Sequence, residues 1–286
     1  MDDATLAIVL ALGALLVGAV ADLLYRVGQT RGIDTGVFLF WQSAIFSVGI
    51  WAGALATGQI DDIIASTWVW GLPSGLLSYV GLYLFVFSLR TGDASVNAPV
   101  FRLNFVVAAA GGILLLGESA SLPKIGGIFL AIVSVLSLLN LRAVREGGAA
   151  RQSLITVVAA SLLFGSVGVL AKHALNEGSS AVPLILTQTV AFQSGATFYV
   201  LFTRRWRPNM PTFRYAPPIS ALQLVWSVLL FQALELGDAS VAFPVVQLSF
   251  VLTAVLAVAF LGETINRTKV GGLALAVLAV GALALA

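Results

Sequence analysis

The sequence contains no cysteine and a single histidine, His173, among its 286 residues. The absence of cysteine excludes disulfide bonds, thiolate metal sites and a cysteine nucleophile. One histidine is too few for a metal site built from several histidines, and it argues against a haem site as well. We therefore expect no bound metal and no cofactor.

Charged side chains are also scarce. Asp, Glu, Lys and Arg make up 10% of the chain, whereas hydrophobic residues make up 59%. A soluble domain carries about 25% charged residues, so a chain this apolar has too few polar side chains to cover a surface that faces water. Its solvent must be lipid, and no nucleic-acid partner is expected.

Long apolar runs take the place of the missing charge. Separated by Gly, Pro and charged residues, they predict ten helices, most of them long enough to cross a hydrocarbon core of about 30 Å. The predicted helices cover residues 4–27, 35–56, 67–89, 94–116, 122–141, 153–175, 181–203, 214–235, 239–261 and 267–286. The sequence therefore predicts an all-α integral membrane protein with ten transmembrane helices.

The distribution of basic residues predicts how these helices are oriented. Alternate connections, beginning with the one after 4–27, hold twelve Lys and Arg residues or have them at their edges, whereas the opposite side holds only Lys124 and Lys172. Basic residues accumulate in cytoplasmic loops. We expect a multi-pass protein of a bacterial-type cytoplasmic (inner) membrane, with both termini on the outer, periplasmic side.

The chain also contains an internal repeat. Residues 91–100 read TGDASVNAPV and residues 236–245 read LGDASVAFPV, and fourteen of the 27 positions in 92–118 are identical 145 residues later. The predicted halves, 1–145 and 146–286, hold five helices each. Because five is odd, the second half enters the membrane from the opposite face. Such two inverted five-helix repeats are the usual construction of a secondary transporter, although duplication also enlarges a bundle without creating a transport site.

The repeated motifs resemble those of the drug/metabolite transporter superfamily, in its ten-helix branch with two EamA-type domains. The resemblance depends on G-x-A-S-x-x-x-P at the start of 94–116 and 239–261, and on L-G-E at their ends. It implies a central cavity lined mainly by the third, fourth, eighth and ninth helices, and a function in exporting amino acids or related metabolites. The motifs do not specify a substrate.

Arg102 is the most informative single residue. It lies about two turns into 94–116, with apolar sequence on both sides. Charges inside a membrane usually face the protein interior or water, and a guanidinium binds carboxylates with two parallel hydrogen bonds. The repeat places Gln247 at the equivalent position, so a positive and a neutral wall would suit a small zwitterion. Snorkelling of the Arg102 side chain to the cytoplasmic interface is the alternative.

Other polar and aromatic side chains are candidates for lining a substrate site. Spacing places Asn97, Phe101 and Asn104 on one face of a helix, and Tyr79 and Tyr83 one turn apart on another. Ser249 is the repeat equivalent of Asn104. The alternative for the aromatic residues is ordinary core packing, and for glutamines it is hydrogen bonding between helices. The expected substrate-binding residues are Gln42, Tyr79, Tyr83, Asn97, Phe101, Arg102, Asn104, Gln188, Trp226, Gln247 and Ser249.

Two prolines and the L-G-E motifs are expected to act on the backbone. Pro99 and Pro244 lie about five residues into their helices, where proline removes a hydrogen-bond donor. They predict a kink or hinge, unless they only start the helix. Glycine ends a helix readily, so we expect Glu118 and Glu263 to pair with a neighbouring helix end.

The acidic residues bear on ion coupling. Asp22 is the one acidic residue expected inside the membrane, and it lies four residues from Arg26, well placed for an ion pair within the helix. Proton-coupled transporters generally relay protons through a buried carboxylate. Since Asp22 lies toward the end of its helix, uncoupled, gradient-driven transport is favoured. Lys172 is expected to snorkel to the surface.

The sequence therefore favours a secondary transporter that exports small metabolites, foremost amino acids including aromatic ones, by alternating access. A proton-coupled exporter of cationic amphipathic drugs is the alternative. An enzyme is not expected, because the chain shows neither a G-x-S-x-G nucleophile motif nor a phosphate-binding loop. The partners are a small-molecule substrate and the lipid bilayer. A monomer is sufficient, although the glycines of 122–141 and 267–286 would also serve a dimer.

Overall fold

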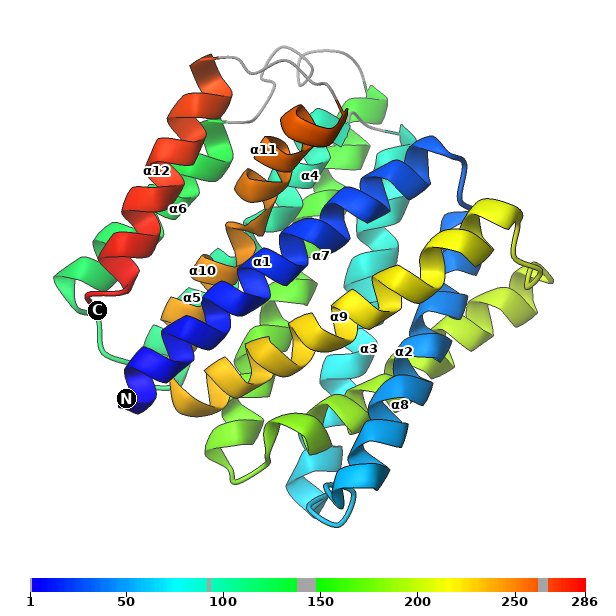
Figure 1. Ribbon diagram of the computed structural model, residues 1–286, viewed down its shortest axis with the longest axis horizontal. Helices are drawn as coiled ribbons and strands as arrows, with labels where there is room; N and C mark the ends of the chain where they lie inside the picture. Colours follow the sequence, from blue (N-terminus) through cyan, green and yellow to red (C-terminus); the bar gives the residue numbers. More distant parts are fainter. Residues whose placement is uncertain (1, 92–93, 138–147, 262–266) are drawn as a thin grey trace.

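The computed structural model describes residues 2–91, 94–137, 148–261 and 267–286, and these parts of the chain form helices and short connections without any strand (Figure 1). The helices are α1 Asp3–Thr30, α2 Thr35–Thr57, α3 Ala65–Thr91, α4 Ala94–Arg102, α5 Asn104–Leu115, α6 Leu122–Ser137, α7 Gly148–Asn176, α8 Ala181–Thr203, α9 Met210–Leu236, α10 Ala239–Gln247, α11 Ser249–Leu261 and α12 Arg267–Leu283.

The helices have the length and composition of membrane spans. Within the described residues, eight segments are long and apolar enough to cross a bilayer, and α6 and Val270–Leu283 are shorter apolar helices. Large apolar side chains point outward from the bundle, among them Val48 (71% exposed), Phe198 (70%) and Phe202 (80%). Such an exposed apolar surface is stable only against lipid. The chain is therefore a multi-pass membrane protein.

Two of the predicted spans are broken, and this corrects the sequence-based prediction. Residues 94–116 and 239–261 were each expected to form one helix, but α4 ends before Leu103 and α10 ends before Leu248. At both positions the backbone tightens, since Leu103 N–H donates to Val100 O at 3.1 Å and Leu248 N–H donates to Val245 O at 3.2 Å. These are bonds to the residue three positions earlier, the pattern of a 3₁₀ turn.

The prolines lie one turn before these breaks. Pro99 and Pro244 are inside α4 and α10, each four residues ahead of the leucine at which the helix changes. A proline inside a helix removes one backbone bond and distorts the preceding turn. Because the break follows the proline by the same four residues in both halves, the broken helix is a property of the repeated motif.

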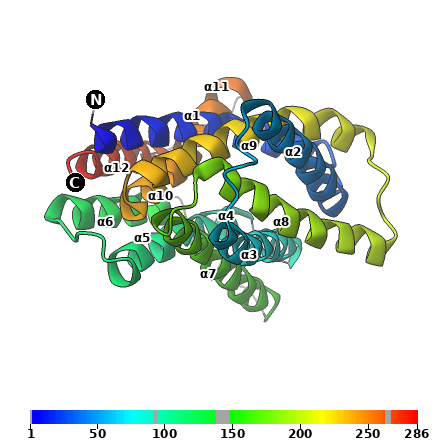
Figure 2. The ribbon, with the colours of Figure 1, turned by 90° about the horizontal axis from the view of Figure 1, so that it is seen from below.

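The helices pack in pairs that join the two halves of the chain. In the first half, α3 packs against α7 and α8; in the second, α9 packs against α1 and α2. The short helices α6 and α12 pack against each other at one side of the bundle (Figures 1 and 2).

Both chain termini lie at one end of the molecule, which we call the termini end. The opposite end carries the α1–α2 and α8–α9 connections with Arg31, Arg204, Arg205 and Arg207, and we call it the basic end.

Glycines allow the backbones of α3 and α8 to approach closely. A Cβ added at Gly75 would overlap the backbone carbonyl oxygen of Gln188, and one at Gly71 would overlap the side chain of Thr187. Small residues spaced four apart are the usual means of bringing two membrane helices together. The α3–α8 contact thus depends on both glycines.

We expect Gly75→Ala to lower the free energy of unfolding by about 1–3 kcal/mol, the usual cost of overpacking a close interface. The backbone of α8 cannot rotate away as a side chain would, so the two helices must separate. Thermal unfolding in detergent measures the change. Gly53→Ala in α2 is the matched control, since nothing lies within 4 Å of its Cβ position. Equal stability of the two variants would show that α3 and α8 tolerate the extra methyl group.

Candidate functional site

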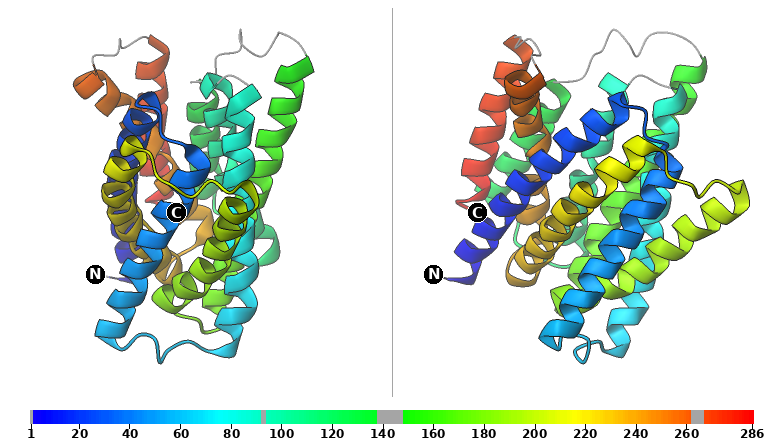
Figure 3. Two further views of the ribbon diagram at one scale, coloured as in Figure 1. Left: turned by 90° about the vertical axis from the view of Figure 1, so that its right-hand side faces the viewer. Right: turned by 45° about the vertical axis from the view of Figure 1, so that its right-hand side comes forward.

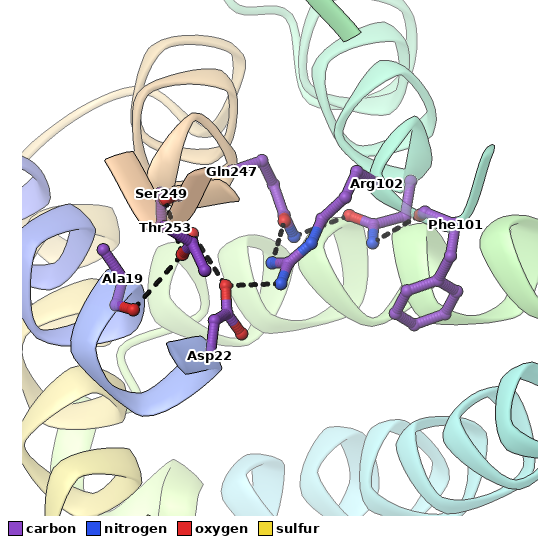
Figure 4. A network of polar contacts seen from close by, with 8 residues as sticks. Ala19, Asp22, Phe101, Arg102, Gln247, Ser249 and Thr253 are labelled. Atoms are coloured by element: carbon purple, nitrogen blue, oxygen red, sulfur yellow. Dashed lines mark hydrogen bonds and ion pairs between the residues drawn. The ribbon is translucent and has the colours of Figure 1, made fainter. Parts of the chain in front are cut away.

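The two helix breaks meet at an ion pair inside the bundle. Arg102 is the last residue of α4, and its Nη2 atom lies 2.6 Å from the Asp22 carboxylate of α1. Its Nη1 atom donates to the side-chain oxygen of Gln247, the last residue of α10, at 3.0 Å (Figure 4). One guanidinium therefore joins three helices that are distant in sequence.

The first residues after the breaks extend this network. Gln247 donates through its side-chain nitrogen to Asn104 at 2.8 Å, and Asn104 donates to the backbone oxygen of Phe101 at 2.9 Å. The Ser249 hydroxyl lies 3.5 Å from the Asp22 carboxylate. A broken helix leaves backbone carbonyls without intrahelical donors, so the amide of Asn104 both satisfies one such carbonyl and orients Gln247.

The ion pair is not sealed from its surroundings. The side chains of Arg102 and Asp22 each retain 25% of their accessible surface, whereas Asn104 and Gln247 are buried. A charged pair within membrane-spanning helices is stable where it faces water or protein rather than lipid. Moreover, the guanidinium is directed at Asp22 and Gln247, which disfavours the snorkelling interpretation of Arg102. The ion pair thus keeps part of its surface accessible inside the bundle.

Arg102 and Gln247 occupy equivalent positions of the sequence repeat, 145 residues apart, and they contact each other directly. Asn104 and Ser249 are likewise equivalent and belong to the same network. Residues at equivalent positions of the sequence repeat therefore meet in one network.

Other predicted site residues lie in separate contacts. Asn97 is buried and donates to the Ser88 backbone oxygen at 2.9 Å and to the Ser153 hydroxyl at 2.7 Å, which joins α4 to α3 and α7. Phe101 is also buried and stacks on Phe85 with a ring separation of 4.2 Å. The structure thus places these two side chains within helix packing next to the ion pair.

The predicted tyrosines form an aromatic column between α3 and α8. The ring of Tyr79 lies 6.3 Å from that of Tyr83 and 5.5 Å from that of Phe192, and Tyr83 lies 5.7 Å from Tyr199. A small pocket borders this column and is lined by Gly36, Leu39, Tyr83, Val86, Phe87 and Tyr199. The tyrosines therefore belong to an apolar surface with hydroxyl groups, on helices other than those that hold the ion pair.

The remaining candidates are distributed over several helices. Gln188 donates to the Ser74 hydroxyl at 2.9 Å and so joins α8 to α3. The backbone oxygen of Gln42 accepts a bond from Ser220 of α9 at 2.9 Å. Trp226 lies close to Gly18, where an added Cβ would come within 3.0 Å of the indole ring. Of these three, Trp226 is nearest to the network, because Ser249 borders the same glycine.

Sequence reasoning missed the partner of Arg102. Asp22 was assigned to its own helix, as an ion-pair partner of Arg26, and not to Arg102, 80 residues away. Thr253 was also missed; it donates to the Ala19 backbone oxygen at 3.2 Å and ties α11 to α1 beside the site. Asp22 is the one acidic residue expected within the membrane. Because no other carboxylate was available there, its scarcity was the signal that could have identified it as the partner of Arg102.

The described residues contain no group of three or more His, Asp or Glu side chains that could hold a metal ion. The site residues offer one carboxylate, one guanidinium, two amides and hydroxyl groups. Such a set is chemically able to bind a small polar molecule through hydrogen bonds and paired charges.

Comparisons with known proteins place this arrangement among transporters. Residues 5–140 and 151–285 match the model of the EamA-like transporter family. The glucose uptake protein GlcU of Staphylococcus xylosus is 30% identical over 128 residues, and the match covers 44% of this chain and 43% of that protein. The match thus spans less than half the length of this relative.

A solved structure shows the same fold. A crystal structure described only as that of a protein superposes with a TM-score of 0.81, and the match covers 98% of this chain and 97% of the other. The two sequences are 14% identical. The helical arrangement is therefore shared over nearly the whole length, whatever each protein transports or binds.

Proposed function

This chain belongs to the EamA-like transporter family, and from this premise we propose that it is a secondary transporter that exports small zwitterionic metabolites, foremost amino acids. Transport proceeds by alternating access and without coupling to an ion. The contact of Arg102 with both Asp22 and Gln247 at the two helix breaks carries this proposal. The protein acts as a carrier and not as an enzyme.

The proposed architecture is ten membrane spans in two inverted repeats, 1–145 and 146–286. In this scheme α4 with α5, and α10 with α11, each form one broken span. The packing of the helices supports it, because the α3–α7 contact has its counterpart in α1–α9, and α3–α8 in α2–α9. The two separate family matches support the same division. Broken helices at a repeat interface are a recurrent feature of transporter binding sites.

The substrate class follows from the charges at the site. Arg102 and Asp22 neutralise each other at 2.6 Å. A substrate carboxylate that approaches Arg102 must displace Asp22, and the released carboxylate then requires a new cation. An amino acid supplies both the anion and the cation, because its carboxylate binds the guanidinium of Arg102 and its ammonium group binds Asp22. An anion or a cation alone would leave one partly buried charge without a partner, which is costly.

Several further features belong to the same proposal. The basic end, with Arg31, Arg204, Arg205 and Arg207, faces the cytoplasm, and both termini face outward across a bacterial-type inner membrane. A single chain suffices for function. The close approach at Gly127 supports this, because the glycine lies against Leu283 of α12 in the same chain.

Sugar transport is the second candidate. The named relative is a glucose uptake protein, and a carboxylate beside a guanidinium and two amides also suits hydroxyl groups. A proton-coupled exporter of cationic drugs has less support, because the Asp22 carboxylate already has a cationic partner.

We expect purified protein in liposomes to catalyse saturable counterflow of zwitterionic amino acids, unaffected when a proton ionophore removes the pH gradient. The panel should contain glucose, glutamate, arginine and a hydrophobic cation at equal concentrations. Glucose exchange without amino-acid exchange would transfer the assignment to sugars. Loss of flux with the ionophore would contradict uncoupled transport.

A further inference from the structure

The termini end of the bundle is closed by a carboxylate from one half of the chain that binds a helix of the other. Glu118 follows α5, and its carboxylate accepts hydrogen bonds from the backbone N–H groups of Ala239 at 2.7 Å and Ser240 at 2.9 Å. It also accepts a short bond from the Ser240 hydroxyl. All three donors lie in the first turn of α10, so one side chain of the first half caps a helix of the second.

The seat for Glu118 is built by its neighbours. Asp238 is the N-cap residue of α10, but its side chain makes no capping bond, so the free N–H groups of the first turn depend on Glu118. Gly117 has a φ of 73°, a left-handed conformation that glycine adopts readily, and it turns the chain after α5. At Gly112 an added Cβ would lie 2.5 Å from the Glu118 carboxylate. The L-G-E motif thus contacts the repeated G-D-A-S motif of the other half.

A second contact accompanies the first. Lys124 of α6 lies 2.6 Å from the carboxylate of Asp238, and the lysine side chain is 1% exposed. Lys172, which was expected at the surface, is buried and donates to the Leu234 backbone oxygen at 2.7 Å. Four charged side chains, Glu118, Lys124, Lys172 and Asp238, are therefore committed to contacts at the termini end. The sequence-based expectation that Glu118 pairs with a helix end is confirmed, whereas Gly262 and Glu263 lie outside the described residues.

Among the residues that the structure describes, the opposite end does not repeat this packing. The repeat offset relates α5 to α11 and α10 to α4, so contact between α5 and α10 is equivalent to contact between α11 and α4. The structure packs α5 against α10, but within the described residues α4 and α11 are not packed in the same way. Figures 2 and 3 show α4 and α11 well apart. The molecule is thus joined at the termini end and spread at the basic end.

We infer that the contact of Glu118 with the first turn of α10 is a latch that holds the termini end closed in this state and opens once in each transport cycle. The inference rests on the alternating-access part of the proposed function. A static cap would remain in place throughout the cycle. A latch must release α10 before a solute at Arg102 can leave through the termini end.

Thiol labelling tests the latch without any substrate, and the chain has no cysteine of its own. Ala242→Cys is a suitable reporter, since Ala242 is buried in α10 just beyond the capped residues. A membrane-impermeant maleimide is added from the side that carries an N-terminal tag. Adding Glu118→Ala should raise the labelling rate about tenfold or more, because several charge-assisted hydrogen bonds are lost.

Glu177→Ala is the matched control, because Glu177 is exposed in the α7–α8 connection and belongs to the same end. It should leave the labelling rate unchanged. Unchanged labelling in a folded Glu118→Ala variant would overturn the inference.

A cross-link tests the opposite prediction by replacing the latch contacts with a covalent link. The pair Glu118→Cys and Ser240→Cys, joined by a cleavable thiol cross-linker, should hold the termini end closed. Counterflow should then stop and return after cleavage with a reductant. Counterflow that continues at full rate in cross-linked protein would overturn the latch but leave the transport proposal intact. Absence of counterflow in the unmodified protein would contradict the proposed function instead, while the labelling result would still stand.

Discussion

Arg102→Ala is expected to weaken amino-acid transport by about 10- to 100-fold, the range expected when a charged hydrogen-bonding group is lost from a binding site. Arg102 has two roles in the proposed site: it holds Asp22 in the resting protein and it receives the substrate carboxylate. Removal of the guanidinium leaves Asp22 without this partner at the site, so a zwitterion meets one charge of the wrong sign for its carboxylate. Concentration-dependent counterflow should show the loss mainly as weaker apparent affinity.

Two companion variants separate charge from geometry. In the wild type, the two guanidinium nitrogens of Arg102 donate separately to Asp22 and Gln247. Arg102→Lys keeps the positive charge but loses this planar pair of donors, so we expect a transport defect between those of the wild type and Arg102→Ala. Arg207→Ala removes an exposed arginine from the basic end and should transport normally. If Arg102→Ala folds and transports like the wild type, the ion pair has only a structural role and the substrate site must lie elsewhere.

Asp238→Ala is expected to lower the free energy of unfolding by about 3 kcal/mol, near the low end for removing one partner of a buried ion pair. The side chain of Lys124 is 1% exposed, so its ammonium group cannot turn to water when Asp238 is removed. The low end applies because Asp238 is itself 40% exposed, and water already shares part of its charge. Unfolding in detergent, followed by helical circular dichroism, measures the loss.

The double variant Lys124→Met, Asp238→Ala provides the decisive comparison. It removes the buried cation together with its partner, so much of the lost stability should return. Asp61→Ala is the matched single control, since Asp61 is exposed in the α2–α3 connection at the same end. A double variant as unstable as Asp238→Ala would show that Lys124 is not the reason for the loss.

The two ends of α10 have different roles, because its last residue, Gln247, belongs to the site and its first turn belongs to the latch. Arg102 and Gln247 lie at the breaks, where two short helices end. The latch lies at the start of α10, one short helix of nine residues away from Gln247. Movement of α10 as a unit would thus connect the closed end of the molecule to the site without unfolding any helix.

Much of this protein follows from the sequence alone. Low charge and long apolar runs require a lipid environment, because no other solvent accepts so much apolar surface. The repeated G-D-A-S and L-G-E motifs identify the two halves, and the resemblance to the EamA type is confirmed by the family match. Arg102 stands out because a charge between apolar residues is expensive in a membrane unless protein or water faces it.

The tertiary structure decided the partners of these residues. Helical periodicity reports which side chains share a face of one helix, but it carries no information about which helix lies opposite. Sequence spacing predicts Asp22 beside Arg26 of the same helix, but it carries no signal for the contact of Asp22 with Arg102, 80 residues away. The prolines predict a kink near Pro99 and Pro244, but the sequence does not place the breaks at Leu103 and Leu248, since a single 3₁₀ turn leaves the apolar pattern intact. Composition and repetition determined the solvent and the family, while only packing across the two halves determined where the charges meet.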